Sequence, residues 1–91
     1  MSITYVALCT NIPEAGDSSD ILKEPPFNAG YVRSILEKEF AQFPKATGRW
    51  NNLLSIVTVK DSKVIYVHIY DKPKHVYPGD RIKVHVYQEE I

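Results

Sequence analysis

The most reactive side chains in this chain belong to one cysteine and three histidines. Cys9 could act as a nucleophile, but no histidine is near it in sequence and no neighbouring residue is expected to lower its pKa. We therefore interpret Cys9 as a small buried residue. His68 and His85 fall on the same face of two predicted strands, with His75 between them, yet the ligand spacing of zinc motifs is missing. The sequence thus predicts no metal and no other cofactor.

Other catalytic motifs are missing from the sequence as well. Asp61, Asp71 and Asp80 all occupy predicted turns, where aspartate stabilises the backbone. The chain has four glycines, and they form neither a phosphate-binding loop nor a nucleophile elbow. We expect a protein that is not an enzyme, and an enzyme using Cys9 or the histidines is the weakest of the alternatives.

Tyrosines and bases alternate along two predicted strands, and this pattern is the main indication of function. Successive side chains of a strand point to opposite faces of a sheet. The residues predicted to share one exposed face are Tyr66, His68, Tyr70, Arg81, Lys83, His85 and Tyr87. Tyrosine and arginine are enriched at the centres of protein interfaces, and aromatic rings beside bases are also typical of sheets that stack nucleobases. Tyrosine pairs that only stabilise an exposed sheet are the third interpretation.

This face favours a small accessory or inhibitory module that binds another protein, or its own copy as a homodimer, through the face or a strand edge. The alternative is binding of single-stranded RNA or DNA, with tyrosines stacking on bases and cations near phosphates. No apolar run is long enough to cross a bilayer, and no export signal precedes the first strand. We therefore expect no membrane partner and a cytoplasmic location.

Composition limits these alternatives. The 91 residues are enough for one domain, and their 44% hydrophobic and 24% charged content is ordinary for a globular protein. Eleven bases balance eleven acids, so the chain lacks the basic excess of a dedicated nucleic-acid binder. Residues 1–44 hold six acids and three bases, whereas residues 45–88 hold eight bases and three acids. An acidic loop and helix beside a basic sheet would give this asymmetry.

The predicted fold is α+β, a single domain spanning residues 1–91 in the order β-α-β-β-β. Its strands are expected at residues 3–10, 53–60, 63–70 and 81–88, in a mainly antiparallel sheet of four strands, with residues 75–77 as a candidate fifth. One amphipathic helix, residues 28–43, is expected to pack on one face of the sheet. Asn28 suits the helix N-cap, Pro44 would stop the helix, and the apolar residues recur at helical spacing. That stripe consists of Val32, Ile35, Leu36, Phe40 and Phe43.

The central hairpin is expected to reverse at Asp61 and Ser62, so that Thr58 opposes Ile65 and Ile56 opposes Val67. Leu54, Ile56, Ile65, Val67 and Ile69 would then form an aliphatic inner face. Because a single helix can cover a single sheet face, we expect no intramolecular cover over the tyrosine-bearing face.

Three connections complete the prediction. Residues 11–26 are expected to form a long acidic loop, with a helical turn near Ser19 or Asp20 that docks Ile21 and Leu22 on the body. Trp50 is expected to close one end of the core. Residues 77–80 carry Pro78 and Gly79 at the central positions of a type II turn.

Overall fold

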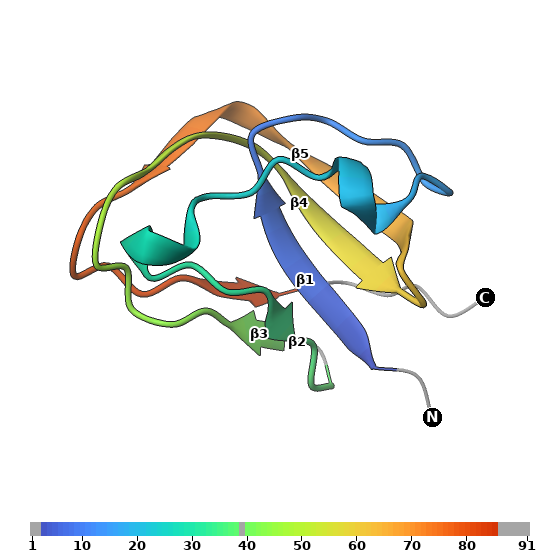
Figure 1. The fold of residues 1–91 in the computed structure, drawn as a ribbon, viewed down its shortest axis with the longest axis horizontal. Coiled ribbons are helices and arrows are strands. Elements are labelled where there is room, and N and C mark those ends of the chain that lie inside the picture. The colour runs from blue at the N-terminus through green and yellow to red at the C-terminus, as the bar shows by residue number, and fades with distance from the viewer. Residues whose placement is uncertain (1–2, 39, 86–91) are drawn as a thin grey trace.

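The chain folds into two antiparallel sheets in the computed structural model, which describes residues 3–38 and 40–85 (Figure 1). The larger sheet has the strand order β2-β1-β4-β5, and the smaller pairs β3 with β6. The strands are β1 (Thr4–Cys9), β2 (Ser34–Ile35), β3 (Phe40–Gln42), β4 (Trp50–Lys60), β5 (Lys63–Val76) and β6 (Lys83–His85). The described residues contain no α-helix, so the fold is all-β and the predicted α+β class with its β-α-β-β-β order is wrong.

The predicted helix of residues 28–43 is replaced by a single 3-10 turn, η2 (Phe27–Ala29), and the strands β2 and β3. Gly30 ends the turn in a left-handed conformation, with φ of 84°, which turns the chain out of a helical path. Beyond it, burial alternates with the period of a strand, because Ala41 and Phe43 are buried while Phe40 and Gln42 are exposed. The helical spacing of the apolar residues was therefore coincidental.

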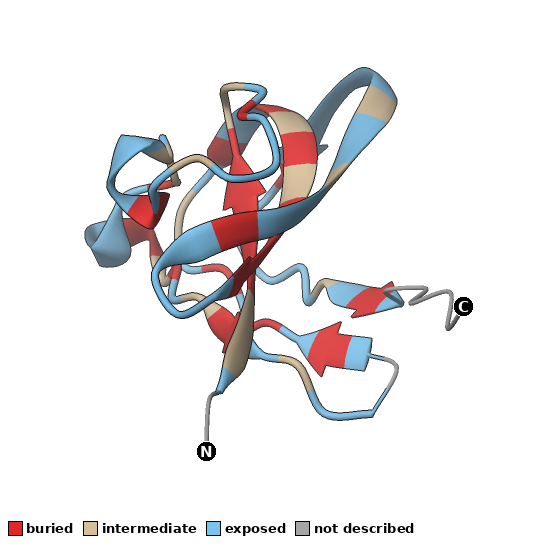
Figure 2. Cartoon of the chain, turned by 90° about the vertical axis from the view of Figure 1, so that its right-hand side faces the viewer, coloured by how far each residue is buried: buried red, intermediate tan, exposed pale blue. Residues whose placement is uncertain are grey.

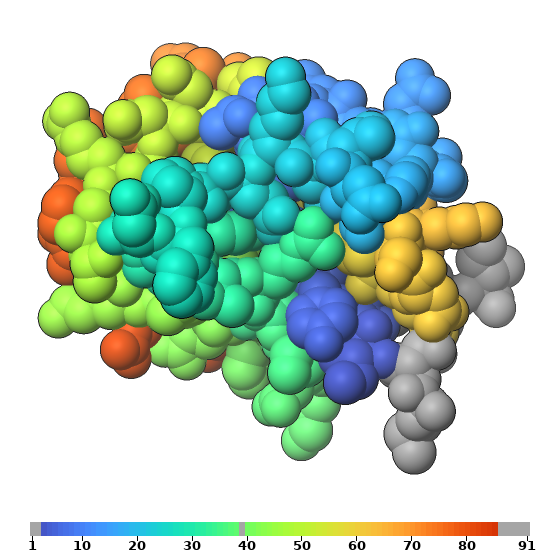
Figure 3. Space-filling view, viewed as in Figure 1, coloured from blue at the N-terminus to red at the C-terminus, as the bar shows by residue number. Residues whose placement is uncertain are grey.

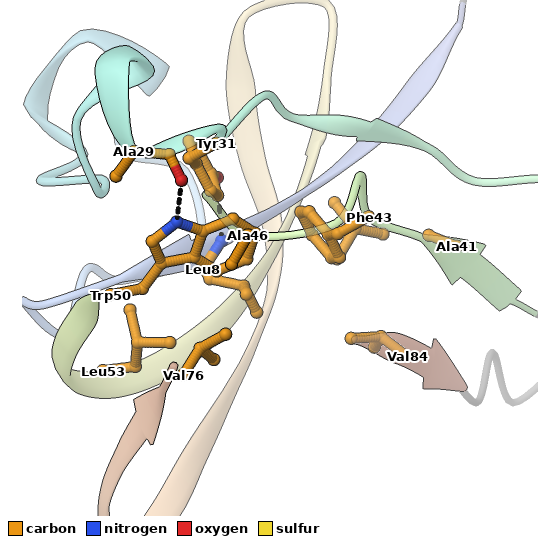
Figure 4. Close-up of a cluster of buried hydrophobic side chains, with 11 residues drawn as sticks. Leu8, Ala29, Tyr31, Ala41, Phe43, Ala46, Trp50, Leu53, Val76 and Val84 are labelled. Atoms are coloured by element: carbon orange, nitrogen blue, oxygen red, sulfur yellow. Dashed lines mark hydrogen bonds between the residues drawn. The ribbon is translucent and has the colours of Figure 1, made fainter. Parts of the chain in front are cut away.

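A buried aromatic cluster fills the space between the two sheets. Tyr31 and Phe43 stack with ring centroids 5.9 Å apart, and Trp50 meets Tyr31 edge-on at 5.3 Å. The Trp50 indole N–H donates to the carbonyl of Ala29 over 2.9 Å, the bond drawn in Figure 4. Trp50 is fully buried, as predicted, and its hydrogen bond ties the 3-10 turn to the start of β4.

The opposite face of the large sheet is covered by the loop of residues 11–26. This face carries a second cluster, with Ala7 and Cys9 of β1 against Val57 and Val59 of β4. The predicted helical turn is present as η1 (Ser19–Ile21), capped by the Ser18 side chain. Leu22 packs on the cluster, whereas Ile21 stays 47% exposed. In Figure 3 this loop and the turn after it, cyan to teal, cover much of β4, which is open to view in Figure 1.

The β4–β5 hairpin turns at Asp61 and Ser62 as predicted, and both residues have positive φ. One step into β5, however, a bulge inserts an extra residue, Ile65, so that Thr58 faces Tyr66 and Ile56 faces His68. The predicted pairings of Thr58 with Ile65 and of Ile56 with Val67 are therefore wrong. The predicted aliphatic inner face is wrong with them: Ile65 and Ile69 are 42% and 54% exposed.

Strand β5 runs on to Val76, well past the predicted end at residue 70. A tight turn follows, in which the Asp80 N–H donates to the Tyr77 carbonyl and Gly79 has φ of 95°, as a type II turn requires. β6 then pairs with β3 and not with β5. Figure 2 shows the two short strands below the hairpin, each with one buried residue between exposed ones. Residues 86–88 of the predicted last strand lie outside the described residues.

Replacing Gly30 with alanine distinguishes this fold from the predicted helix. In a helix Gly30→Ala would stabilise the protein by about 1 kcal/mol. Here the φ of 84° disfavours any Cβ, and a Cβ would lie 2.9 Å from the Thr47 amide nitrogen. We expect Gly30→Ala to lower the free energy of unfolding by more than about 2 kcal/mol, measured by urea titration.

Gly16→Ala is the matched control, because Gly16 also has a positive φ, 97°, but nothing lies within 4 Å of its added Cβ. This variant should lose only about 1 kcal/mol. An increase in stability for Gly30→Ala would contradict the described turn.

Candidate functional site

A groove with a volume of about 350 Å³ lies between β5 and β6. It opens because the two strands diverge after the turn at residues 77–80, β5 following β4 and β6 following β3. We call it the β5–β6 groove. Its lining residues are Ile56, Thr58, Tyr66, His68, Tyr70, Lys74, Ile82, Lys83, Val84 and His85.

The β5–β6 groove is aromatic and basic, and none of its described lining residues is acidic. His68 meets the ring of Tyr70 edge-on, with centroids 6.1 Å apart, and the Lys74 ammonium lies 5.7 Å from the Tyr70 centroid. On the other wall the Lys83 ammonium lies 4.2 Å from the ring of Phe40. The one ion pair among residues 3–38 and 40–85 is Arg33–Glu24, so neither lysine has an acidic partner there. The groove therefore presents uncompensated positive charge beside aromatic rings.

Thr58 places an unpaired hydroxyl at the base of the β5–β6 groove. Its side chain is 1% exposed, and its Oγ1 has no hydrogen-bond partner among the described residues. Thr58 is paired with Tyr66 across the hairpin and therefore shares the groove face. An unpaired buried hydroxyl costs stability.

The groove brings together five of the seven predicted site residues: Tyr66, His68, Tyr70, Lys83 and His85. Tyr70 is half-buried, and burial raises its pKa to about 12. Arg81 is exposed but does not line the groove, and Tyr87 lies outside the described residues. Tyr66 and His68 are exposed, as predicted for this face, whereas Tyr70 is half-buried and packs against the main core.

Sequence reasoning missed the groove's apolar residues, its hydroxyl and one of its lysines. Ile56 and Thr58 were assigned to the inner face, because the bulge at Ile65 leaves no clear mark in the sequence. Lys74 lies beyond residue 70, where the predicted strand ends, whereas β5 continues to Val76.

Glu24, Tyr31 and Arg33 form a partly buried hydrogen-bond network near Cys9. Tyr31 donates its hydroxyl proton to Glu24 over 2.7 Å and accepts from the Leu8 N–H over 3.0 Å. Arg33 donates twice to the Glu24 carboxylate, over 2.8 and 2.9 Å. Burial, and then the charge of Glu24, raise the pKa of the Cys9 thiol to about 12, whereas Arg33 lowers it. Such a thiol is almost entirely protonated at neutral pH, which makes it a poor nucleophile.

The third histidine lies apart from the other two. His75 accepts a hydrogen bond from the Asn52 N–H through Nδ1 over 3.3 Å, and it does not line the groove. Among residues 3–38 and 40–85, no three histidine, cysteine or acidic side chains are close enough to hold a metal ion. The same residues include no helix that is long and apolar enough to cross a membrane.

Comparison of the chain with protein-family models, with curated proteins and with solved structures gives no match. Function must therefore be inferred from the site. The β5–β6 groove is the site whose residues carry the most ligand-directed chemistry: aromatic rings, two free ammonium groups and an unpaired hydroxyl.

Replacing Thr58 with valine should stabilise the free protein. Valine keeps the branched shape and removes the unpaired hydroxyl, so we expect the free energy of unfolding to rise by about 1 kcal/mol. Ser55→Ala is the control. Ser55 is equally buried, but its hydroxyl donates to the Asn11 carbonyl over 2.7 Å, and the variant should lose about 1 to 2 kcal/mol. Equal losses for the two variants, measured by urea titration, would show that the Thr58 hydroxyl is bonded.

Stability should fall at alkaline pH, in part because of Cys9. Its pKa rises from 9.0 to about 12 on folding, so its contribution is complete below pH 9 and is lost as pH rises to 12. Between those limits the free energy of unfolding should fall by about 1.4 kcal/mol per pH unit from this thiol alone. Urea titrations of wild type and Cys9→Ala between these pH values should give a shallower pH slope for the variant. Identical slopes would contradict the buried thiol.

Proposed function

We propose that this chain is a non-enzymatic binding module that holds a segment of another protein in the β5–β6 groove. The observation that carries the proposal is the groove's combination of exposed aromatic rings with two lysines that have no acidic partner among residues 3–38 and 40–85. A volume of about 350 Å³ is within the range of specific ligand sites. Tyrosine-centred surfaces with a charged rim are typical of protein interfaces.

Two features favour a protein segment over single-stranded nucleic acid. Only Lys74 and Lys83 bring permanent positive charge into the groove, and two phosphate contacts would give a log-affinity against log-salt slope of only about −1.4. The ring of Tyr70 is half-buried between His68 and Lys74, so it is a poor platform for base stacking. Two cations and one half-buried tyrosine ring suit a short acidic peptide better than a longer phosphate backbone.

Selection from a displayed library of random peptides tests the proposal. Peptides that bind wild type should bind Tyr66→Ala and Lys83→Glu at least about tenfold more weakly, because each variant removes a groove contact. Affinities would be measured by fluorescence anisotropy with the labelled peptides. Selected peptides should also be enriched in acidic residues, which complement the lysines.

Matched controls are available on the same chain. Tyr77→Ala removes a tyrosine that is 48% exposed, like Tyr66, but lies outside the groove. Lys63→Glu makes the same charge change as Lys83→Glu at the far end of the hairpin. Peptides that lose as much affinity on the controls as on the groove variants would contradict the proposal. Salt-dependent binding of labelled oligothymidylate that is lost in Lys83→Glu would favour nucleic acid instead.

A further inference from the structure

Among the residues that the structure describes, no strand pairs with the edge of β6 beside the β5–β6 groove. The Phe43 N–H donates to the Ile82 carbonyl over 2.8 Å, and the register continues through Ala41 opposite Val84. Because bonded pairs alternate along an antiparallel ladder, Val84 bonds to Ala41, while the backbone groups of Lys83 and His85 point away from β3. No β3 residue lines the groove, so that free edge faces it.

The smaller sheet, β3 with β6, lacks the third strand that usually stabilises such a sheet. β3 and β6 have three residues each, and in the described part of the chain they form a sheet of these two strands. A two-stranded sheet is marginal, and a third strand is the usual solution. The smaller sheet is already attached to the larger one on the far side of β3, where the Ser34 hydroxyl donates to the Gln42 carbonyl over 2.8 Å. Space for a third strand therefore remains only on the groove side of β6.

A strand paired with β6 would have a defined side-chain pattern. Residues opposite Lys83 and His85 would share their outer side of the sheet, and acidic residues there would pair with the Lys83 ammonium. The residue opposite Val84, which is 5% exposed, would point inward, toward Ile56 and Thr58. That inner position suits a small apolar or hydroxyl residue, because Val84 and Thr58 beside it are almost fully buried.

We propose that the β5–β6 groove binds an extended segment of a partner protein that adds to β6 as an antiparallel strand, with acidic residues alternating with small apolar or hydroxyl residues. This inference rests on the proposed function and specifies its ligand. Both sheets of the protein are antiparallel, which favours that direction for the added strand. The main-chain bonds to Lys83 and His85 supply affinity, and the alternating side chains supply specificity.

A labelled peptide, acetyl-Glu-Val-Glu-Thr-Glu-Val-Glu-amide, tests the inference by fluorescence anisotropy. In the proposed register the N–H groups of its glutamates face β6. N-methylation of the two central glutamates should weaken binding at least about tenfold, whereas N-methylation of the central threonine and one valine should change it less than about twofold. A lysine-for-glutamate version should also bind at least about tenfold more weakly.

The outcomes separate this inference from the proposed function. If the two N-methylated peptides bind alike, or if no peptide of the set binds saturably, strand addition of this acidic class to β6 is wrong. If the unmodified peptide binds but Tyr66→Ala and Lys83→Glu leave its affinity unchanged, the groove is not the site and the proposed function fails as well. Displacement of the bound peptide by oligothymidylate, without an effect of N-methylation, would assign the groove to nucleic acid and overturn both.

Discussion

One extra residue in β5, Ile65, determines which side chains meet in the groove. The two-residue turn at Asp61 and Ser62 sets Val59 opposite Val64, and the bulge then moves every later partner by one position. As a result Tyr66 and His68 share a face with Thr58 and Ile56, the face that also carries Val6 and Leu8 of the main core. Without the bulge, Val67 would pair with Ile56 in place of His68. Tyr66 and His68 would then lie on the opposite face, which the loop of residues 11–26 covers.

The divergence of β5 and β6 then turns this face into a groove. Each strand is bonded to a different sheet, and only the short turn at residues 77–80 joins them. The unpaired hydroxyl of Thr58, the uncompensated Lys74 and Lys83 and the free edge of β6 all lie along this opening. Each of them costs stability or invites association in the isolated chain. Sites where a protein departs from good packing and pairing in this way are commonly sites of function.

The sequence predicted the parts of the fold that local chemistry determines. The hairpin turn, the type II turn with Gly79, the helical turn before Leu22 and the burial of Trp50 are all present. Each depends on residue types that have a strong local preference. Five of the seven residues predicted to share an exposed face line the groove, and three of them, Tyr66, His68 and Tyr70, do so because the alternation along β5 was identified correctly.

The errors arise where distant contacts override local preference. Val32, Ile35 and Phe40 fit a helical stripe, yet Tyr31 is held in the core by hydrogen bonds to Leu8 and Glu24, and Gly30 turns the chain before a helix can form. The Leu8–Tyr31 bond joins residues 23 apart in the sequence, and no local pattern indicates it. The bulge at Ile65 is likewise not indicated by any local pattern. Because of it, Thr58 and Ile56 share a face with Tyr66 and His68 and not with the predicted aliphatic residues.

Amide hydrogen exchange in the free protein tests the central claim, that the groove edge of β6 is unpaired and available to a ligand. The account predicts that the Val84 amide, bonded to Ala41, exchanges slowly, while the amides of Lys83 and His85 on either side exchange at nearly unprotected rates. Equal protection of all three amides would mean that the edge is already paired, and would contradict the account.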